Sequence, residues 1–331
     1  MRYRYITSPS TDPRWNLALE EYVFDSLPRD KSYFMLWRNH NTIVVGKNQN
    51  TAAEINGQFV RSNDITVVRR LSGGGTVYHD LGNLNFTFIT DAADAAEIDF
   101  RRFCLPIVDA LADLGVKAEI NGRNDITIEG KKFSGNSQYL RDGRAMHHGT
   151  LMFRSDLTVL SRALAVDREK LSAKGIPSVV SRVTNIGDHL PPEVTIDDLR
   201  DALLRHIPCE DNAAPYVLTE ADIAAIDKIA QERYASWEWT YGQSQAVQRR
   251  EKQRIEGGGT IDVALDSDGG IITALEIHGD FFGSGDVAEL SAALVGCRCE
   301  KEALKERLDT LHLQHYIHNC PQEALIELLL P

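Results

Sequence analysis

The sequence contains few cysteines, and their spacing does not suggest a metal site. Five cysteines occur among 331 residues, and no two of them form a Cys-x-x-Cys pair. Zinc sites and redox dithiols usually need such pairs, and a disulfide framework uses an even number of cysteines. We therefore expect neither. Cys104 falls inside a predicted helix among apolar neighbours, so we expect a buried structural thiol there.

Positive charge and long apolar runs are also scarce. The 36 Lys and Arg residues stand against 48 Asp and Glu residues, which gives a net charge of −12. Broad binding to nucleic acid or to an anionic membrane needs cationic surface, so neither partner is expected. No apolar run reaches membrane-spanning length, and the first residues, MRYRYITSPSTDP, lack the apolar run of a signal peptide. These absences predict a cytoplasmic protein.

The apolar content is sufficient for two domains. Hydrophobic residues make up 43% of the chain, and a polar, charged stretch at residues 244–254 is interpreted as a linker. Helical spacing predicts helices at 12–23, 99–115, 196–207, 220–235, 287–295, 301–308 and 321–330. Strands are predicted at 33–37, 42–46, 65–70, 76–78 and 84–89, and as antiparallel pairs along 124–139 and 257–282.

The segment RRLSGGGTVYHDLGNLN, residues 69–85, places two arginines beside three glycines in a turn between predicted strands. Glycines 73 to 75 can adopt positive φ and direct successive N–H groups at an anion, while Arg69 and Arg70 supply positive charge. The segment is neither a P-loop nor a dinucleotide fingerprint, because no Lys-Ser/Thr follows and no helix begins directly after it. It indicates a phosphate site, although an ordinary glycine-rich hairpin is an alternative.

A second polar group lies on the predicted hairpin at residues 124–139, which turns at Gly130. Strand alternation places Lys131 and Lys132 on opposite faces, so only one of them can face a site. The same argument separates His147 from His148 and disfavours a metal bound by both.

These segments together resemble the lipoate-protein ligase A family, bacterial two-domain type. The match begins with RRLSGGGTVYHDLGNLNFTF and continues in the same order with residues 36–50, 122–139, 147–153, 170–186 and 236–243. The resemblance implies an α+β catalytic domain of the biotin and lipoate ligase type over residues 1–243, with mixed sheets flanked by helices. It also implies a small α+β domain over residues 255–331 that assists adenylation.

The resemblance implies a ligase reaction in two steps. Lipoate, or octanoate, reacts with ATP to form an acyl-adenylate and pyrophosphate, with magnesium as a cofactor. The acyl group then passes to a lysine of an acceptor protein. The acceptors implied are the lipoyl domains of 2-oxoacid dehydrogenase acyltransferase subunits and the glycine cleavage H protein. A monomer is expected.

The resemblance also implies roles for single residues. Lys132, which contacts acyl carbonyl and phosphate in the family, and Arg70 are the expected catalytic groups. Trp37 is expected to close the far end of the acyl pocket, although a core position is an equal alternative. Asn124 and Asp125 are expected to serve the nucleotide, with magnesium at Asp125. The other expected contacts are Ser72, Gly73, Gly74, Gly75, Thr76, Val77, Tyr78, His79, Ser134, Gly135, His148, Gly149, Lys174 and Arg182.

Three alternatives remain at this point. Residues 170–186 are either a lid over the adenylate or a plain connecting loop. An acyltransferase of the same fold would use a cysteine nucleophile, but no cysteine here lies in a glycine-flanked turn near the matching segments. A catalytically silent binding protein is the third alternative, and the retention of Lys132, of the glycine turn at residues 73–75 and of the small-residue turn at Ser134 and Gly135 speaks against it.

Overall fold

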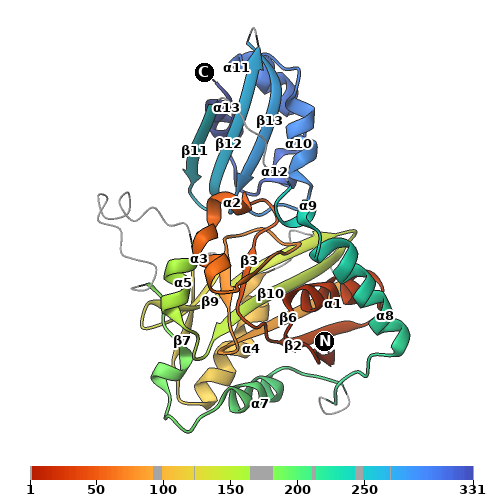
Figure 1. The fold of residues 1–331 in the computed structure, drawn as a ribbon, viewed down its shortest axis with the longest axis vertical. Coiled ribbons are helices and arrows are strands. Elements are labelled where there is room, and N and C mark those ends of the chain that lie inside the picture. The colour runs from red at the N-terminus through yellow and green to blue at the C-terminus, as the bar shows by residue number, and fades with distance from the viewer. Residues whose placement is uncertain are drawn as a thin grey trace.

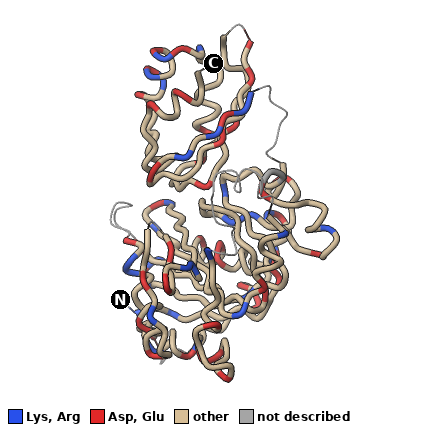
Figure 2. Tube along the Cα trace, turned by 90° about the vertical axis from the view of Figure 1, so that its left-hand side faces the viewer, with Lys and Arg blue, Asp and Glu red and all other residues tan. Residues whose placement is uncertain are grey.

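The computed structural model describes residues 2–91, 99–122, 124–164, 182–210, 214–242, 249–268 and 270–330. Lys174 and most of the predicted lid lie outside the described residues. A larger N-terminal unit and a smaller C-terminal unit are stacked along the long axis (Figure 1). Acidic and basic residues are interspersed along both units (Figure 2). Among the described helices, none combines the length and the apolar character needed to cross a membrane.

The N-terminal unit is built around a mixed sheet of seven strands in the order β1-β2-β6-β10-β9-β8-β7. Only the pair β1 and β2 is parallel, and the other neighbours are antiparallel. The strands are β1 Tyr3–Thr7, β2 Ser32–Trp37, β6 Asn83–Asp91, β7 Ala118–Asn121, β8 Asp125–Ile128, β9 Lys131–Arg141 and β10 Arg144–Met152.

Helices cover both faces of this sheet. Helices α4 (Phe100–Asp113) and α7 (Ile196–His206) bury Phe103 and Leu203 against Phe88 on one face. Helix α1 (Pro13–Asp25) begins at the predicted N-cap Asp12, whose side chain accepts from the Arg14 N–H, and packs on the other face. Beside α1 lie α8 (Glu220–Ile229) and a π-helical turn (Ala230–Tyr234).

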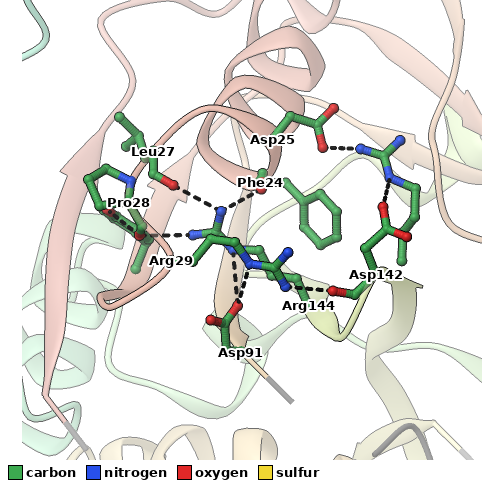
Figure 3. A network of polar contacts seen from close by, with 10 residues as sticks. Phe24, Asp25, Leu27, Pro28, Arg29, Asp91, Asp142 and Arg144 are labelled. Carbon is green, nitrogen blue, oxygen red and sulfur yellow. Dashed lines mark hydrogen bonds and ion pairs between the residues drawn. The ribbon is translucent and has the colours of Figure 1, made fainter. Parts of the chain in front are cut away.

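The C-terminal end of α1 is fixed to the sheet by arginines (Figure 3). Arg144, the first residue of β10, donates to the carbonyls of Phe24 and Leu27 at 2.6 and 3.0 Å. Helix ends leave carbonyls without helical partners, and this buried guanidinium satisfies that of Phe24 in the last turn and that of Leu27 just beyond the helix. The register of α1 on the sheet therefore depends on Arg144.

A smaller sheet, in the order β4-β3-β5, carries the glycine turn. Its strands are β3 (Thr42–Val45), β4 (Thr66–Arg69) and β5 (Val77–His79), and the glycines lie between β4 and β5 as predicted. Short helices that the sequence did not indicate pack beside it: α2 (Thr51–Glu54), α3 (Gly57–Ser62) and α5 (Leu157–Ala163). A 3-10 turn (Ile186–His189) and α9 (Trp237–Thr240) complete the unit.

The C-terminal unit is an antiparallel three-stranded sheet with helices on one side (Figure 1). It comprises β11 (Arg249–Ile255), β12 (Gly259–Asp268), β13 (Ile271–Gly279), α10 (Val287–Leu294), α11 (Lys301–Asp309), α12 (Leu313–Tyr316) and α13 (Gln322–Leu329). The predicted linker at 244–254 is wrong from Arg249 onward, because RREKQR forms most of edge strand β11. Charged side chains are common on such exposed edges, which explains why this strand resembles a linker in sequence.

Candidate functional site

A cavity of about 120 Å³ lies between the two sheets of the N-terminal unit. It is lined by twelve of the predicted residues: Trp37, Arg70, Gly74, Gly75, Thr76, Val77, His79, Asn124, Lys132, Gly135, His148 and Gly149. Six more lining residues were not predicted: Leu17, Val44, Asn85, Asn136, Ser137 and Thr150. Residues from segments far apart in sequence therefore converge on one site.

Arg69 does not contribute charge to this cavity, so that part of the prediction is wrong. It is 1% exposed and donates to the carbonyls of Gly46, Lys47 and Gln49 at 2.9, 2.8 and 2.6 Å. It also donates to the Thr240 carbonyl at 2.9 Å. Nε, Nη1 and Nη2 of Arg69 all donate hydrogen bonds that join β4 to the residues after β3 and to α9. Arg69 is therefore a structural residue.

Arg70 does line the cavity, and it organises the glycine turn. Its guanidinium donates to the carbonyls of Gly73 and Gly75 at 2.7 and 2.8 Å and to Ser72 Oγ at 3.0 Å. Burial lowers its pKa to about 10, and the nearby Glu20 carboxylate opposes that shift. The side chain therefore carries its positive charge at neutral pH.

The glycine turn differs from the expected row of N–H groups. Only Gly74 has positive φ, at 90°, and its N–H points to the Phe281 carbonyl of the C-terminal unit at 3.4 Å. A Cβ on Gly73 would lie 2.4 Å from the same carbonyl. These glycines thus allow the close approach of the C-terminal unit as well as forming the cavity wall.

Lys132 and Lys131 face opposite ways, as predicted. The Lys132 Nζ atom lies 2.7 Å from Asp125 Oδ1 and lines the cavity, whereas Lys131 is exposed. A Cβ on Gly135 would come within 2.9 Å of Nζ, so the glycine leaves room for the lysine head group. Residues 183 and 184 lie beside Lys132, because the Thr184 N–H donates to the Lys132 carbonyl at 2.9 Å.

Several predicted residues lie near the cavity without lining it. Alternation along β5 turns Val77 and His79 inward and Tyr78 outward, where its hydroxyl donates to Asn41 Oδ1 at 3.1 Å. Arg182 is exposed and precedes Val183, which bridges to Lys132. The other predicted residues that do not line the cavity are Ser72, Gly73, Asp125 and Ser134.

A buried chain of polar contacts supports the cavity and includes a residue that sequence reasoning missed. Glu20 Oε1 lies 3.0 Å from His148 Nδ1, and His148 Nε2 lies 2.6 Å from Ser72 Oγ. Thr87 Oγ1 donates to the same Glu20 oxygen at 2.5 Å and accepts from Trp37 Nε1 at 3.0 Å. Glu20 thereby connects the Trp37 wall with the glycine turn. The sequence signal for Glu20 was its position three residues after Leu17, which places a carboxylate on the apolar face of the predicted helix.

This chain has the order of a Ser-His-acid triad, but its serine cannot act as a nucleophile. Ser72 is 1% exposed, does not line the cavity and accepts from Arg70. A nucleophile must reach the reacting carbon, so the role of Ser72 is to hold Arg70 and His148 in place.

His147 and His148 point to opposite faces of β10. The His147 ring stacks on Phe103 at 4.7 Å between ring centroids, on the face covered by α4. Burial, with a smaller contribution from His148, lowers the pKa of His147 to about 3. Among the described residues, no group of three or more His, Cys, Asp or Glu side chains is arranged to hold a metal.

The cysteines do not support an acyl-enzyme mechanism. None of the five lines the cavity. Burial raises the pKa of the Cys104 thiol to about 12 and those of Cys209 and Cys320 to about 11. A nucleophilic cysteine needs a lowered pKa and access to substrate.

Comparison with known proteins confirms the predicted fold and family. Residues 12–208 match the lipoyl protein ligase A/B catalytic domain, and residues 244–329 match the bacterial lipoate protein ligase C-terminus. The chain is 44% identical to the lipoate-protein ligase LplJ of Bacillus subtilis, over 96% of this chain and 97% of that protein.

Two solved structures are similar as well. A bipartite lipoate protein ligase from Thermoplasma acidophilum, described with its E2 lipoyl domain, is 29% identical with a TM-score of 0.65, over 74% of this chain and 98% of that chain. A lipoate-protein ligase A bound with ATP is 28% identical with a TM-score of 0.63, over 74% and 100%. The fold, both domain matches and the near full-length similarity place this chain in the lipoate-protein ligase family.

Proposed function

We propose that the cavity binds the acyl chain of lipoate and presents its carboxylate, beside Lys132, to the α-phosphorus of ATP. The observation that carries the proposal is a cavity with apolar walls, including Leu17, Trp37 and Val44, that also contains the Lys132 ammonium group. An ω-substituted medium-chain acid needs this combination of an apolar tunnel and a cation for its carboxylate.

The proposed chemistry uses charge and position, without a covalent enzyme intermediate. A lipoate carboxylate oxygen attacks the α-phosphorus, the bond to the β-phosphate oxygen breaks, and pyrophosphate leaves. Negative charge gathers on the phosphoryl oxygens, and Lys132 and Arg70 are the cations that line the site. Their placement would lower the barrier by stabilising that charge.

We further propose that Asp125 and Asn124 hold Mg²⁺ together with phosphate oxygens of ATP. Mg²⁺ in nucleotide sites usually takes one or two carboxylates plus substrate phosphates. Asp125 is a partly exposed carboxylate at the Lys132 end of the cavity, which fits that donor set. When bound, the ion would neutralise phosphate charge.

In the second half-reaction the neutral amine of an acceptor lysine attacks the acyl carbon, and AMP leaves. We propose lipoyl domains as acceptors, including the glycine cleavage H protein, and a monomeric enzyme that acts in the cytoplasm. The acceptor amine is mostly protonated at neutral pH, so orientation in the site has to compensate. Support comes from the family membership and from the relative described with its E2 lipoyl domain.

The test is pyrophosphate-ATP exchange with the purified protein and Mg²⁺, comparing lipoate, octanoate, biotin and no acid. We expect exchange with lipoate and octanoate and none with biotin. Subsequent transfer to a purified lipoyl domain, with its target lysine changed to arginine as the control, tests the acceptor. Absence of exchange with all three acids would contradict the proposed activation step.

A further inference from the structure

The part of the cavity beside Trp37 contains two polar side chains as well as apolar ones. His79 and Asn85 both line the cavity. The His79 ring lies 6.1 Å from the Trp37 ring between centroids, and Asn85 is the register partner of Trp37 across β2 and β6. Trp37, on β2, is separated from the strand of Lys132 by β6 and β10, about 14 Å across the sheet, and Asn85, on β6, is separated from it by β10, about 10 Å. These side chains therefore lie at the end of the cavity remote from Lys132.

The hydrogen-bond pattern fixes where His79 carries its proton. Asn16 Nδ2 lies 2.9 Å from the Arg38 carbonyl, which can only accept, so this atom is the amide nitrogen. It also donates to Asn39 Oδ1 at 2.9 Å. The other amide atom of Asn39, Nδ2, therefore faces His79 Nδ1 at 3.2 Å. A donor faces Nδ1, so Nδ1 accepts and the ring proton is on Nε2.

The resulting His79 Nε2–H group is a buried donor on a side chain that lines the cavity. His79 is 3% exposed, and within the described part of the chain Nε2 has no hydrogen-bond partner. Burial, together with Arg70, lowers the pKa of His79 to about 3, so the ring is neutral at working pH.

Asn85 also has a buried donor without a hydrogen-bond partner among the described residues. Its Oδ1 atom accepts from Asn83 Nδ2 at 2.9 Å, and its own Nδ2 has no partner among the described residues. The side chain is 1% exposed. Two unpaired donors thus belong to side chains that line the end of the cavity where an octanoyl chain would place a methyl group. A methyl group cannot accept a hydrogen bond, and unpaired buried donors disfavour such a complex.

We propose that His79 Nε2 and Asn85 Nδ2 donate hydrogen bonds to the dithiolane sulfur atoms of lipoate, and that these bonds select lipoate over octanoate. The inference rests on the proposed function and adds the residues that contact the dithiolane ring, at the end of the acid remote from the carboxylate. Sulfur is a weak acceptor, so the selectivity is moderate, about tenfold in kcat/KM. Trp37 and Leu17 supply shape and apolar contact for either acid.

The experiment compares lipoate with 5-cyclopentylpentanoate, which keeps the ring and chain but has carbon in place of both sulfur atoms. In pyrophosphate exchange, the wild type is expected to favour lipoate about tenfold in kcat/KM. His79→Phe keeps a flat ring without the donor, and Asn85→Leu keeps the branched shape without the amide. Each is expected to lower the ratio, while His79→Gln, which retains an N–H donor, keeps more of it than His79→Phe.

Equal kcat/KM values for the two acids in the wild type would overturn the inference, and this comparison needs no variant to fold. An unchanged ratio in both folded variants, His79→Phe and Asn85→Leu, would overturn it as well. The proposed ligase function fails differently, because no acid would then support exchange in the wild type.

Discussion

Lys131 and Lys132 are adjacent, yet their environments predict different consequences for the same substitution. Lys132 lines the cavity and pairs with Asp125, whereas Lys131 is exposed. We expect Lys132→Ala to lower the rate of adenylation by about 10²–10³-fold, because one stabilising cation is lost from the transition state. Lys131→Ala is the matched control and should retain nearly full activity. Pyrophosphate exchange measures both, with circular dichroism to verify folding.

Equal losses in the two variants would contradict the assignment of faces. A loss for Lys132→Ala that appears only in KM for the acid would restrict the lysine to binding of the ground state.

His147 is buried on the face of β10 opposite the cavity, and its protonation is expected to affect the stability of the fold. Its pKa is lowered from 6.5 to about 3, mainly by burial. In the unfolded chain the histidine takes up a proton below pH 6.5, while the folded chain does not. Its contribution to stability is therefore present above pH 6.5 and is lost as the pH falls toward 3.

Between pH 7 and pH 5 this histidine should reduce the free energy of unfolding by about 2 kcal/mol. His147→Phe removes the titrating group and should make the pH dependence over this range shallower by that amount, whatever its effect at pH 7. Urea unfolding at the two pH values measures the difference. A variant with the same slope as the wild type would show that His147 is accessible to protons in the folded state.

At the scale of elements, periodic patterns in the sequence predicted most helices and strands, and segments without such a pattern were missed. Helix α4 is N-capped by Asp99 and followed by Gly115 at positive φ, and both signals are readable. Strand β11 was read as a linker, because its charged residues match an exposed edge as well as a loop. Its sheet partner β12 begins only four residues later, at Gly259, and that segment was already counted as the first strand of the pair predicted along 257–282.

In the site, too, some residue roles could be predicted from the sequence and others could not. Arg69 and Arg70 are the same residue type in adjacent positions, but Arg69 contacts the end of α9 at Thr240 and Arg70 faces the cavity. Alternation predicts that neighbours differ and does not say which one faces inward. Glu20 and Asn85 were missed because their importance comes from partners on other elements.

The glycine turn offers a matched pair of substitutions. A Cβ on Gly73 would lie 2.4 Å from the Phe281 carbonyl, whereas a Cβ on Gly75 would meet no atom within 4 Å. Neither residue has positive φ, so backbone strain does not distinguish them. We expect Gly73→Ala to displace the C-terminal unit, at a cost of about 1–3 kcal/mol to the contact, and Gly75→Ala to leave it in place.

Small-angle X-ray scattering of the ligand-free variants measures this directly as a larger radius of gyration for Gly73→Ala alone. Equal radii for both variants and the wild type would mean that the turn tolerates a side chain at position 73.

At the scale of the whole molecule, a polar cavity lies between the two units, next to the glycine turn. Its lining includes Glu54 from the N-terminal unit and Lys252, Asp262, His278 and Asp280 from the C-terminal unit. Burial raises the pKa of the Glu54 carboxyl, Asp280 and Asp262 add to this shift, and Lys252 opposes it. His278 is paired with Glu276 at 2.9 Å, and Asp262 with Arg250 at 2.6 Å.

Burial at the junction raises the pKa of Glu54 by more than Lys252 lowers it, so the protonation of Glu54 and the contact between the units are coupled. The contact favours the protonated carboxyl, so this stabilisation is complete below the ordinary pKa of Glu and is lost as the pH rises through the raised value. We expect the two units to separate more readily as the pH increases above the ordinary pKa of Glu, and Glu54→Gln to remove most of that dependence.

Fluorescence transfer between dyes placed on the two units measures the separation, and Glu302→Gln, an exposed position on α11, is the charge-matched control. If Glu302→Gln changed the pH profile as much as Glu54→Gln, the net charge of the whole protein would be the cause. A specific effect of Glu54 would instead mean that one carboxyl at the junction sets how firmly the C-terminal unit rests on the glycine turn. It would thereby connect proton binding in the second cavity to access to the first.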